Sequence, residues 1–148
     1  MKLKDKIILI TASTRGIGLA CVKACAKEGA VVYMAARNLD LAKEEAEKLN
    51  AEGYNVKYVF NDASKPESFI SMIEDVVKEN GRIDVLVNNF GTSKPGQDLD
   101  FSNTDVDVFL DTVNINLRSV FAASKEAVKY MAKQGGGSII NISSVGGL

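Results

Sequence analysis

The stretch that decides the fold is an apolar run that passes directly into a turn of small residues, Ile7-Ile8-Leu9-Ile10-Thr11-Ala12-Ser13-Thr14-Arg15-Gly16-Ile17-Gly18. A strand that feeds such a glycine-containing turn and then opens a helix presents unpaired backbone N–H groups and the positive end of the helix dipole. Both features favour the binding of a phosphate group. The sequence therefore predicts that this turn binds a dinucleotide.

Apolar runs alternate with stretches of helical periodicity along the rest of the chain. Near-continuous apolar strands separated by helices indicate a parallel sheet that is covered on both faces. The third helix is expected to begin at Ser64-Lys65-Pro66-Glu67, a capping box with proline in the first turn. The fold class is thus α/β, a doubly wound parallel sheet of the Rossmann type with five strands, in one domain of residues 1–148. Strands are expected at residues 7–11, 31–36, 56–60, 83–87 and 138–142, and helices at 16–27, 40–51, 64–80 and from about 105 to 131.

A long polar loop, residues 89–103, is expected after the fourth strand. The carboxyl end of a strand is the place where doubly wound sheets bind ligands. Loops of this length are usually functional or disordered. The loop is therefore either a mobile lid over the site or a tolerated insertion.

Composition excludes several classes of function. The chain of 148 residues is 46% hydrophobic and 25% charged, as in a globular domain, and its net charge of −1 provides no basic surface for nucleic acid. No stretch approaches the roughly 18 apolar residues of a membrane span, and the first residues lack the apolar core of a signal peptide. We therefore expect a cytoplasmic protein that binds neither nucleic acid nor a membrane.

The sequence contains no histidine. Ser-His-Asp triads, Cys-His dyads and most zinc sites are therefore excluded, and acid–base chemistry must come from Tyr, Lys or a carboxylate. Cys21 and Cys25 lie one helical turn apart, and without a second pair they are interpreted as two small buried hydrophobic residues. No metal site is expected.

The first turn resembles the TGxxxGxG turn of the short-chain dehydrogenase/reductase family. Ala12 stands where the family has its first glycine, and its Cβ is expected to keep the backbone there out of strongly positive φ. Gly16 and Gly18 retain the close approach to phosphate and the close packing of helix on strand. The resemblance implies cofactor contacts from the residues of this turn, namely Thr11, Ser13, Thr14, Arg15, Gly16, Ile17 and Gly18.

Four further segments match the same family in order and at suitable spacing. Asp62 follows the third strand, where the family uses an acid to contact the adenine, and Asn88-Asn89-Phe90-Gly91 resembles the family's NNAG segment with Phe90 in place of alanine. Asn116 matches the helix asparagine that holds a proton-relay water, and Ser144 matches the substrate-orienting serine, with Ser143 as the second candidate. The resemblance implies a cofactor site that includes Asp62, Ala63, Asn89 and Gly91, and catalytic roles for Asn116 and Ser144.

Each of these residues also has a purely structural interpretation. Asp62 can start the next turn, and Asn88 and Asn89 can be turn formers. Asn116 can be a tolerated polar residue on a helix, and Ser144 a plain loop serine. The functional interpretation is preferred because asparagine is a poor residue for the middle of a helix, and because a hydroxyl at a strand's carboxyl end lies where an active site forms.

The type of cofactor follows from the charge at the end of the second strand. Folds that prefer NAD place an acid there for the ribose 2′-hydroxyl, whereas an arginine accommodates the 2′-phosphate of NADP. This strand ends Ala35-Ala36-Arg37-Asn38, with no carboxylate, and Arg15 is a second cation for the phosphate. A hydrogen bond to a charged group contributes about 1.5–3 kcal/mol, so one arginine favours NADP(H) by roughly 10- to 150-fold. NADP(H) is the expected cofactor, with Arg37 and Asn38 among its contacts.

The family transfers hydride reversibly between the nicotinamide and a carbonyl or alcohol carbon, with a tyrosine as general acid/base and a lysine four residues later that lowers its pKa. None of the four tyrosines of this chain is followed by lysine at that spacing. The family's Tyr-x-x-x-Lys segment would fall just past Leu148. We therefore expect the N-terminal part of a longer enzyme, truncated after the fifth strand, that lacks the family's C-terminal strands and helices and shows no turnover by itself.

Three stretches, residues 13–18, 27–37 and 135–138, resemble bacterial 7α-hydroxysteroid dehydrogenases, which oxidise bile-acid hydroxyls. The resemblance implies an NADP(H)-dependent oxidoreductase that interconverts a secondary alcohol and a ketone on a steroid or another small molecule. A 3-oxoacyl-carrier-protein reductase, another carbonyl reductase and a non-catalytic NADP-binding sensor stay open, whereas Arg37 disfavours a methyltransferase. Family members commonly form dimers or tetramers, partly through the long helix that begins near Asp105. A homo-oligomer is therefore expected at full length, and truncation is expected to expose apolar surface on that helix and on the last strand.

Overall fold

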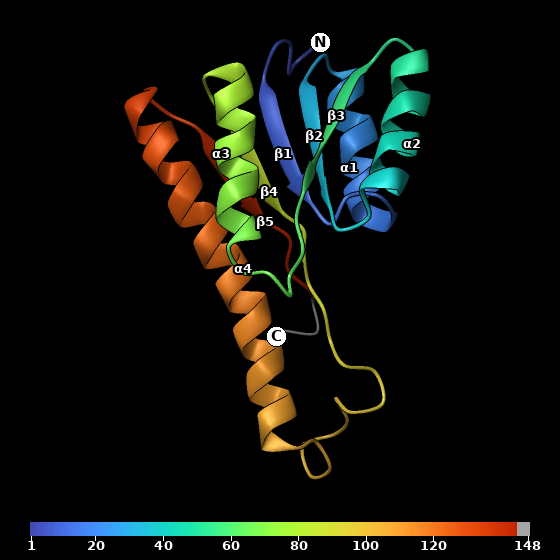
Figure 1. Ribbon diagram of the computed structural model, residues 1–148, viewed down its shortest axis with the longest axis vertical. Helices are drawn as coiled ribbons and strands as arrows, with labels where there is room; N and C mark the ends of the chain where they lie inside the picture. The colour runs from blue at the N-terminus through green and yellow to red at the C-terminus, as the bar shows by residue number, and fades with distance from the viewer. Residues whose placement is uncertain (145–148) are drawn as a thin grey trace.

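The computed structural model describes residues 1–144 and contains one five-stranded parallel sheet, with the strand order β3-β2-β1-β4-β5 (Figure 1). Successive strands are added on one side of β1 as far as β3 and on its other side from β4 onward, so the topological switch point lies between β1 and β4. The predicted Rossmann-type fold is confirmed. The strands are β1 Ile7–Thr11, β2 Val31–Ala36, β3 Asn55–Phe60, β4 Val85–Asn88 and β5 Ser138–Asn141, and the helices are α1 Gly16–Lys27, α2 Leu39–Ala51, α3 Ser68–Asn80 and α4 Val106–Lys133.

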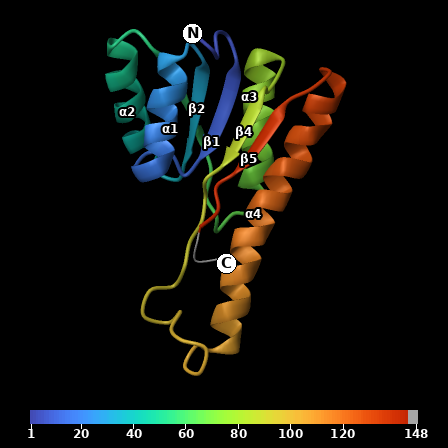
Figure 2. The same cartoon turned by 180° about the vertical axis from the view of Figure 1, so that it is seen from behind.

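Helices cover both faces of the sheet, with α1 and α2 on one face and α3 and α4 on the other (Figures 1 and 2). Side chains alternate between the two faces along a strand, so a strand that is buried throughout needs cover on both sides. β1 shows this directly. Ile8 and Ile10 join Val22 of α1 in one apolar cluster, whereas Leu9 joins Phe69 of α3 in the other.

The third helix begins at Ser68, so the predicted capping box at Ser64 is wrong. The Ser64 hydroxyl and N–H both donate to Asp62 Oδ1, at 2.8 and 2.9 Å, and thereby close a turn on the residues that precede them. The Ser68 hydroxyl accepts the Asp62 N–H at 3.0 Å and donates to the Asp62 carbonyl at 2.9 Å. Local bonds between side chains and backbone compete with the helix, and here the turn replaces its expected first residues.

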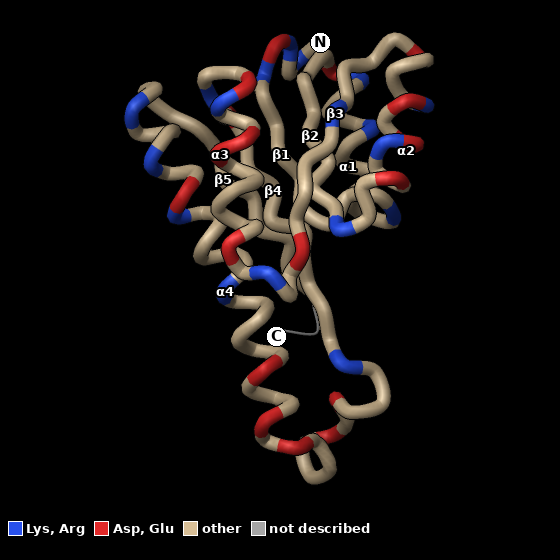
Figure 3. Tube along the Cα trace, in the orientation of Figure 1, with Lys and Arg blue, Asp and Glu red and all other residues tan. Residues whose placement is uncertain are grey.

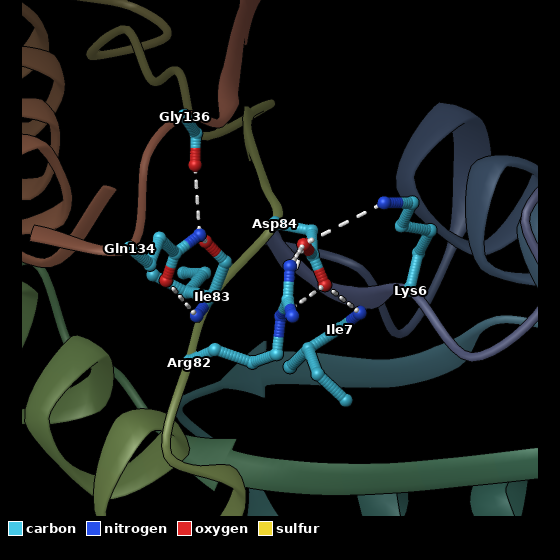
Figure 4. A network of polar contacts seen from close by, with 7 residues as sticks. All are labelled: Lys6, Ile7, Arg82, Ile83, Asp84, Gln134 and Gly136. Atoms are coloured by element: carbon cyan, nitrogen blue, oxygen red, sulfur yellow. Dashed lines mark hydrogen bonds and ion pairs between the residues drawn. The ribbon is translucent and has the colours of Figure 1, made fainter. Parts of the chain in front are cut away.

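The fourth strand is shorter and later than predicted, because Ile83 lies in the connection before β4. The side chain of Gln134, at the end of α4, replaces strand pairing there (Figure 4). Its Nε2 donates to the carbonyls of Ile83 and Gly136 at 2.7 and 2.8 Å, and its Oε1 accepts the Ile83 N–H at 3.3 Å. This carboxamide fixes the end of α4 between β4 and β5. The other predicted ends differ from the observed ones by two residues or fewer, within the usual uncertainty of element boundaries.

Asp84 joins the amino ends of β1 and β4 (Figure 4). Its Oδ2 accepts the Ile7 N–H at 2.9 Å, the Arg82 guanidinium donates to both carboxylate oxygens, and Lys6 Nζ lies 3.9 Å from Oδ1. Burial acts to raise the pKa of Asp84, but the hydrogen bonds from Arg82 and Ile7 and the charges of Arg82 and Lys6 outweigh it and hold the pKa below its ordinary value. Asp84 is therefore a buried carboxylate whose negative charge is stabilised by Ile7, Arg82 and Lys6.

Cys21 and Cys25 are half-buried, so the prediction that both are buried is wrong. Both pack against the apolar cluster beneath α1 and α2, and neither is in a disulfide. Burial, and then the neighbouring Cys21, raise the pKa of the Cys25 thiol. Within residues 1–144, no group of three His, Cys, Asp or Glu side chains is placed to hold a metal ion, and no helix is long and apolar enough to span a membrane.

The segment between β4 and α4 extends beyond the sheet alongside the first turns of α4 (Figures 1 and 2). Residues 92–111 contain five aspartates and one basic residue, Lys94, and acidic segments gather along this part of the molecule (Figure 3). Lys94 Nζ donates to Asp111 Oδ2 at 2.8 Å and so ties the loop to α4. Asp100 closes a turn by accepting the N–H groups of Ser102 and Asn103 at 2.9 and 3.0 Å. The loop thus has internal structure of its own.

Candidate dinucleotide site

The carboxyl ends of the parallel strands meet at one edge of the sheet, and the glycine-containing turn from β1 to α1 lies there at the switch point. α1 begins at Gly16, and the N-cap residue Arg15 makes no capping bond with its side chain. A Cβ built on Gly16, which has a φ of +55°, would meet no atom within 4 Å. The first turn of α1 therefore has its amide groups uncapped by the N-cap side chain and open space in front of Gly16, which suits a phosphate.

Ala12 has a φ of +50°, so the prediction that its Cβ keeps the backbone out of this region is wrong. The Asn89 side chain, which follows β4, holds the turn in this conformation. Asn89 Nδ2 donates to the carbonyls of Thr11 and Ala12, at 3.1 Å each. The surrounding contacts thus outweigh a local conformational penalty of about 1–2 kcal/mol.

Gly18 provides the close packing expected of it. A Cβ on Gly18 would lie 2.5 Å from the Ala12 carbonyl oxygen, 2.7 Å from Asn89 Nδ2 and 2.7 Å from the Ser13 Cα. No side chain fits in that space without movement of the backbone. The absence of a Cβ at Gly18 is what lets α1 approach both the turn and the Asn89 amide.

The hydroxyls of Thr11 and Ser13 hold the turn together from inside the protein, where both residues are buried. Thr11 Oγ1 accepts the N–H groups of Asn89 and Phe90, at 2.9 Å each, and Ser13 Oγ donates to the Ile10 carbonyl at 2.8 Å. Their hydroxyls are thus engaged within the protein. Sequence patterns identified the two residues but did not show that the Thr11 side chain connects β1 to the end of β4, or that the Ser13 side chain bonds back to β1.

The remaining turn residues lie nearer the surface. Thr14 is half-buried, and Arg15, Gly16 and Ile17 are exposed. Within residues 1–144 the Arg15 guanidinium forms no ion pair with a carboxylate. The positive charge of Arg15 is therefore available at the edge where the turn opens.

A second group of predicted residues lies where β2 and β3 end. Arg37, Asn38 and Phe60 line a hollow of about 490 Å³. Asn38 caps α2, because its Oδ1 accepts the Leu41 N–H at 3.1 Å. The hydrogen bonds from Ser64, followed by the charges of Arg37 and Lys65, lower the pKa of the Asp62 carboxyl. The structure thus brings Arg37 and Asp62 to the same end of the sheet, whereas Phe60 and Lys65 were not identified from the sequence.

Asn116 binds the start of the loop after β4. Its Oδ1 accepts the Thr92 N–H at 2.9 Å, and its Nδ2 donates to the carbonyls of Thr92 and Thr112 at 2.7 and 2.8 Å. A Cβ on Gly91 would lie 3.6 Å from Asn116 Oδ1, so these two predicted residues are neighbours. Both N–H donors of the carboxamide are thus bonded, whereas Oδ1, which can accept two hydrogen bonds, accepts one of the three contacts.

The end of β5 carries the predicted serines, and Ala63 after β3 is the last of the predicted residues. Asn141 Oδ1 accepts from Asn88 Nδ2 at 2.9 Å, and Asn88 Nδ2 also donates to Ser124 Oγ at 3.1 Å, which connects β4, β5 and α4. Ser143 lines a groove of about 1140 Å³ between α4 and this strand end. Ser144 follows it and is exposed. Ala63 is half-buried beside Asp62, at the opposite side of the sheet edge.

Comparisons with known proteins agree with this geometry. Residues 6–148 match the sequence profile described as short chain dehydrogenase. The chain is 47% identical to a 7alpha-hydroxysteroid dehydrogenase of Paraclostridium sordellii over 97% of this chain and 54% of that protein. It is 39% identical to a 3-oxoacyl-acyl-carrier-protein reductase of Thermotoga maritima over 100% of this chain and 59% of that protein.

Solved structures show the same fold. A gluconate 5-dehydrogenase of Burkholderia cenocepacia, solved with NADP and tartrate, superimposes with a TM-score of 0.87 at 30% identity, over 97% of this chain and 55% of that chain. The chain spans a little over half the length of the relatives it matches. The sequence profile, the relatives and the sheet with its glycine turn all lead to one conclusion: this chain belongs to the short-chain dehydrogenase/reductase family.

Proposed function

We propose that the protein is an NADP(H)-dependent oxidoreductase that interconverts a secondary alcohol and a ketone, with a steroid hydroxyl as the substrate group. Residues 1–148 are its dinucleotide-binding part. The observation that carries the cofactor class is the arrangement of the β1–α1 turn, which has an uncapped helix start and open space at Gly16. When bound, the nicotinamide cofactor would supply the hydride acceptor or donor.

The residues of the chain divide the work of holding this cofactor. The backbone amides of the turn and the start of α1 bind the pyrophosphate, and Arg15 and Arg37 neutralise the 2′-phosphate. Asp62 has one carboxylate oxygen bonded to Ser64, and its second oxygen is available to accept from the adenine amino group. Thr11, Ser13 and Asn89 position the turn rather than contact the cofactor through their side chains.

The steroid substrate is proposed from the relatives named 7alpha-hydroxysteroid dehydrogenase, one of which shares 47% identity. The 3-oxoacyl-acyl-carrier-protein reductase at 39% identity supports a second candidate. The intact gene product would distinguish them, because a steroid dehydrogenase oxidises a 7α-hydroxy bile acid with NADP⁺, whereas the reductase consumes NADPH with an acetoacetyl thioester. Activity with neither substrate, despite NADPH binding, would favour the non-catalytic sensor.

Residues 1–148 alone are proposed to bind the cofactor without turnover. None of the tyrosines in this chain has a lysine four residues later, and Tyr33 is buried within the sheet with its hydroxyl accepting from Asn80 Nδ2 at 2.8 Å. Burial, as the largest effect, raises the pKa of Tyr33. Such a group is a poor general base. A steady rate of NADPH oxidation by the 148-residue chain, with any ketone, would contradict this part of the proposal.

Self-association at full length is proposed from α4. Its outward face carries exposed apolar side chains, including Phe109, Leu110, Leu117 and Phe121, on the helix that we expected to lie at the subunit contact. Contiguous exposed apolar surface of this kind commonly marks a protein interface. The cytoplasmic location stays a prediction from the sequence.

The cofactor proposal is tested by calorimetric titration of the chain with NADPH and with NADH. We expect NADPH to bind more tightly by about 10- to 150-fold, the range that one charge-assisted hydrogen bond provides. Arg37→Ala is expected to remove most of this preference and to leave the NADH dissociation constant within about twofold. Equal affinity of the unaltered chain for the two cofactors would refute the assignment of NADP(H).

A further inference from the structure

We propose that Lys65 is a specificity-determining residue for the phosphomonoester on the adenosine ribose, acting together with Arg37 across the ring of Phe60. The proposal rests on the proposed NADP(H) preference and deepens it. It assigns a further cation besides Arg15 and Arg37. Lys65 comes from the connection between β3 and α3, at the end of the cofactor that Arg37 approaches from the connection between β2 and α2.

The backbone of Lys65 is fixed by the turn that replaced the predicted capping box. Its N–H donates to the Asp62 carbonyl at 2.9 Å, and its carbonyl accepts the Ser68 N–H at 2.8 Å. The Ser68 hydroxyl also bonds both the N–H and the carbonyl of Asp62. Lys65 therefore projects from a closed, hydrogen-bonded turn that fixes the position of its backbone.

The Lys65 ammonium lies over the ring of Phe60, with 5.3 Å between Nζ and the ring centroid. This distance is within the range of a cation–π interaction. Phe60 also lines the 490 Å³ hollow that contains Arg37 and Asn38. The half-buried Phe60 ring thus has the Lys65 ammonium over its face, and it lines the same hollow as Arg37.

Two carboxylates also lie near these cations. Asp62 is close enough for the charges of both Arg37 and Lys65 to lower its pKa, in addition to the larger effect of its bonds from Ser64. Asp40 lines the hollow at the start of α2. Within residues 1–144 neither Arg37 nor Lys65 forms an ion pair with a carboxylate. Both cations therefore keep their charge available to a ligand.

The charge of the expected ligand explains why more than one cation is expected around it, with Lys65 in addition to Arg15 and Arg37. A phosphomonoester carries a charge of about −1.5 to −2 at neutral pH, so one guanidinium leaves part of it uncompensated. Arg37 suits the bidentate contact, because its planar fork matches a phosphate, and Lys65 adds a compact point charge. A free 2′-hydroxyl is uncharged, so the ammonium stabilises it much less than it stabilises a phosphate. Lys65 therefore discriminates between the two forms of the adenosine.

The test uses adenosine 2′,5′-bisphosphate and AMP as calorimetric probes, since they differ only in the 2′-phosphate. Lys65→Gln is expected to raise the dissociation constant of the bisphosphate about 3- to 10-fold and to leave that of AMP within about twofold. The loss is expected to shrink when the ionic strength is raised from about 0.01 M to 1 M, because salt screens an exposed charge. Lys65→Arg is expected to retain the preference.

Lys78→Gln is the matched control. It removes the same charge from an exposed lysine near the other end of α3 and is expected to change the binding of neither probe. If Lys65→Gln weakens both probes equally, Lys65 acts through the turn or the Phe60 ring, and the proposal is wrong. It is equally wrong if neither constant changes.

The two proposals fail in different ways. If the unaltered chain binds both probes equally, the NADP(H) assignment is refuted and Lys65 has no phosphate to recognise. If the chain prefers the bisphosphate and Arg37→Ala removes that preference while Lys65→Gln does not, the NADP(H) assignment stands and the role of Lys65 alone is refuted.

Discussion

Gly18 offers the sharpest test of how the turn is built. In Gly18→Ala, the new Cβ would lie 2.5 Å from the Ala12 carbonyl oxygen, 2.7 Å from Asn89 Nδ2 and 2.7 Å from the Ser13 Cα. Two of these three atoms belong to the backbone, which cannot move aside as the end of a flexible side chain can. The substitution therefore has to displace α1 from the turn or push the Asn89 carboxamide out of its place.

The magnitude follows from the contacts that are lost. Overpacking of a tight site costs about 1–3 kcal/mol. Displacement of Asn89 also removes its two bonds to the carbonyls of Thr11 and Ala12, each of which contributes about 1 kcal/mol. We expect Gly18→Ala to lower the free energy of unfolding by about 3–5 kcal/mol in total, which corresponds to a fall in Tm of roughly 6–20 °C for a domain of this size.

Urea denaturation followed by far-UV circular dichroism measures this loss, with Gly53→Ala as the matched control. Gly53 has a φ of +91° and open space around its Cβ position, so alanine there meets only the left-handed backbone penalty of about 1–2 kcal/mol. NADPH binding should be lost in Gly18→Ala and retained in Gly53→Ala. If Gly18→Ala lowers the free energy of unfolding no more than Gly53→Ala does, the close packing of α1 on the turn does not stabilise the site and the reasoning is refuted.

Three further results are expected. Ala12→Gly should raise the free energy of unfolding by about 1 kcal/mol, because glycine adopts the observed φ of +50° without a Cβ penalty; a decrease in the urea midpoint would contradict this. The pKa of Asp84 is lowered in the folded protein, so the stabilisation by its carboxylate is complete above about pH 4–5 and is lost as the pH falls through the lowered pKa. Asp84→Asn should therefore lower the free energy of unfolding at pH 7 and make that free energy depend less on pH between about 5 and 3. An unchanged slope of the free energy of unfolding against pH would refute this. Asn116→Ala removes the side-chain bonds to Thr92, so the Thr92 amide should lose its protection from hydrogen exchange; retained protection would show that the loop is held elsewhere.

The sequence predicted the fold most reliably where one apolar signal dominates. The ends of β1, β2 and α1 agree with the prediction. A continuous apolar run is typical of a strand that is buried on both faces of a parallel sheet, and Gly16 marks the residue at which the helix begins. Predictions failed where a side chain can form a hydrogen bond with more than one local partner. Ser64 bonds to Asp62 rather than capping a helix, and that choice depends on the position of Ser68, which spacing alone does not reveal.

The same holds for the site: sequence motifs predicted which residues lie there, but not the contacts that depend on the folded structure. The order of the motifs placed Arg37 and Asp62 at one end of the sheet, as observed. It could not show that Ala12 is held at positive φ by Asn89, a residue 77 positions away in sequence. Nor could it show that the Lys65 ammonium lies over the ring of Phe60, because that contact depends on a turn which the capping-box pattern did not predict.

The most direct test of the account is an amide-resolved NMR titration of the chain with NADP⁺. We expect the largest chemical-shift changes at the backbone N–H groups of residues 13–18, with a second group at Arg37 and Asn38. The chemical shifts of the amides at the opposite end of the sheet, around Gln134 and Gly136, should stay unchanged. Shifts that avoid residues 13–18 while NADP⁺ binds would contradict the claim that the β1–α1 turn is the phosphate site.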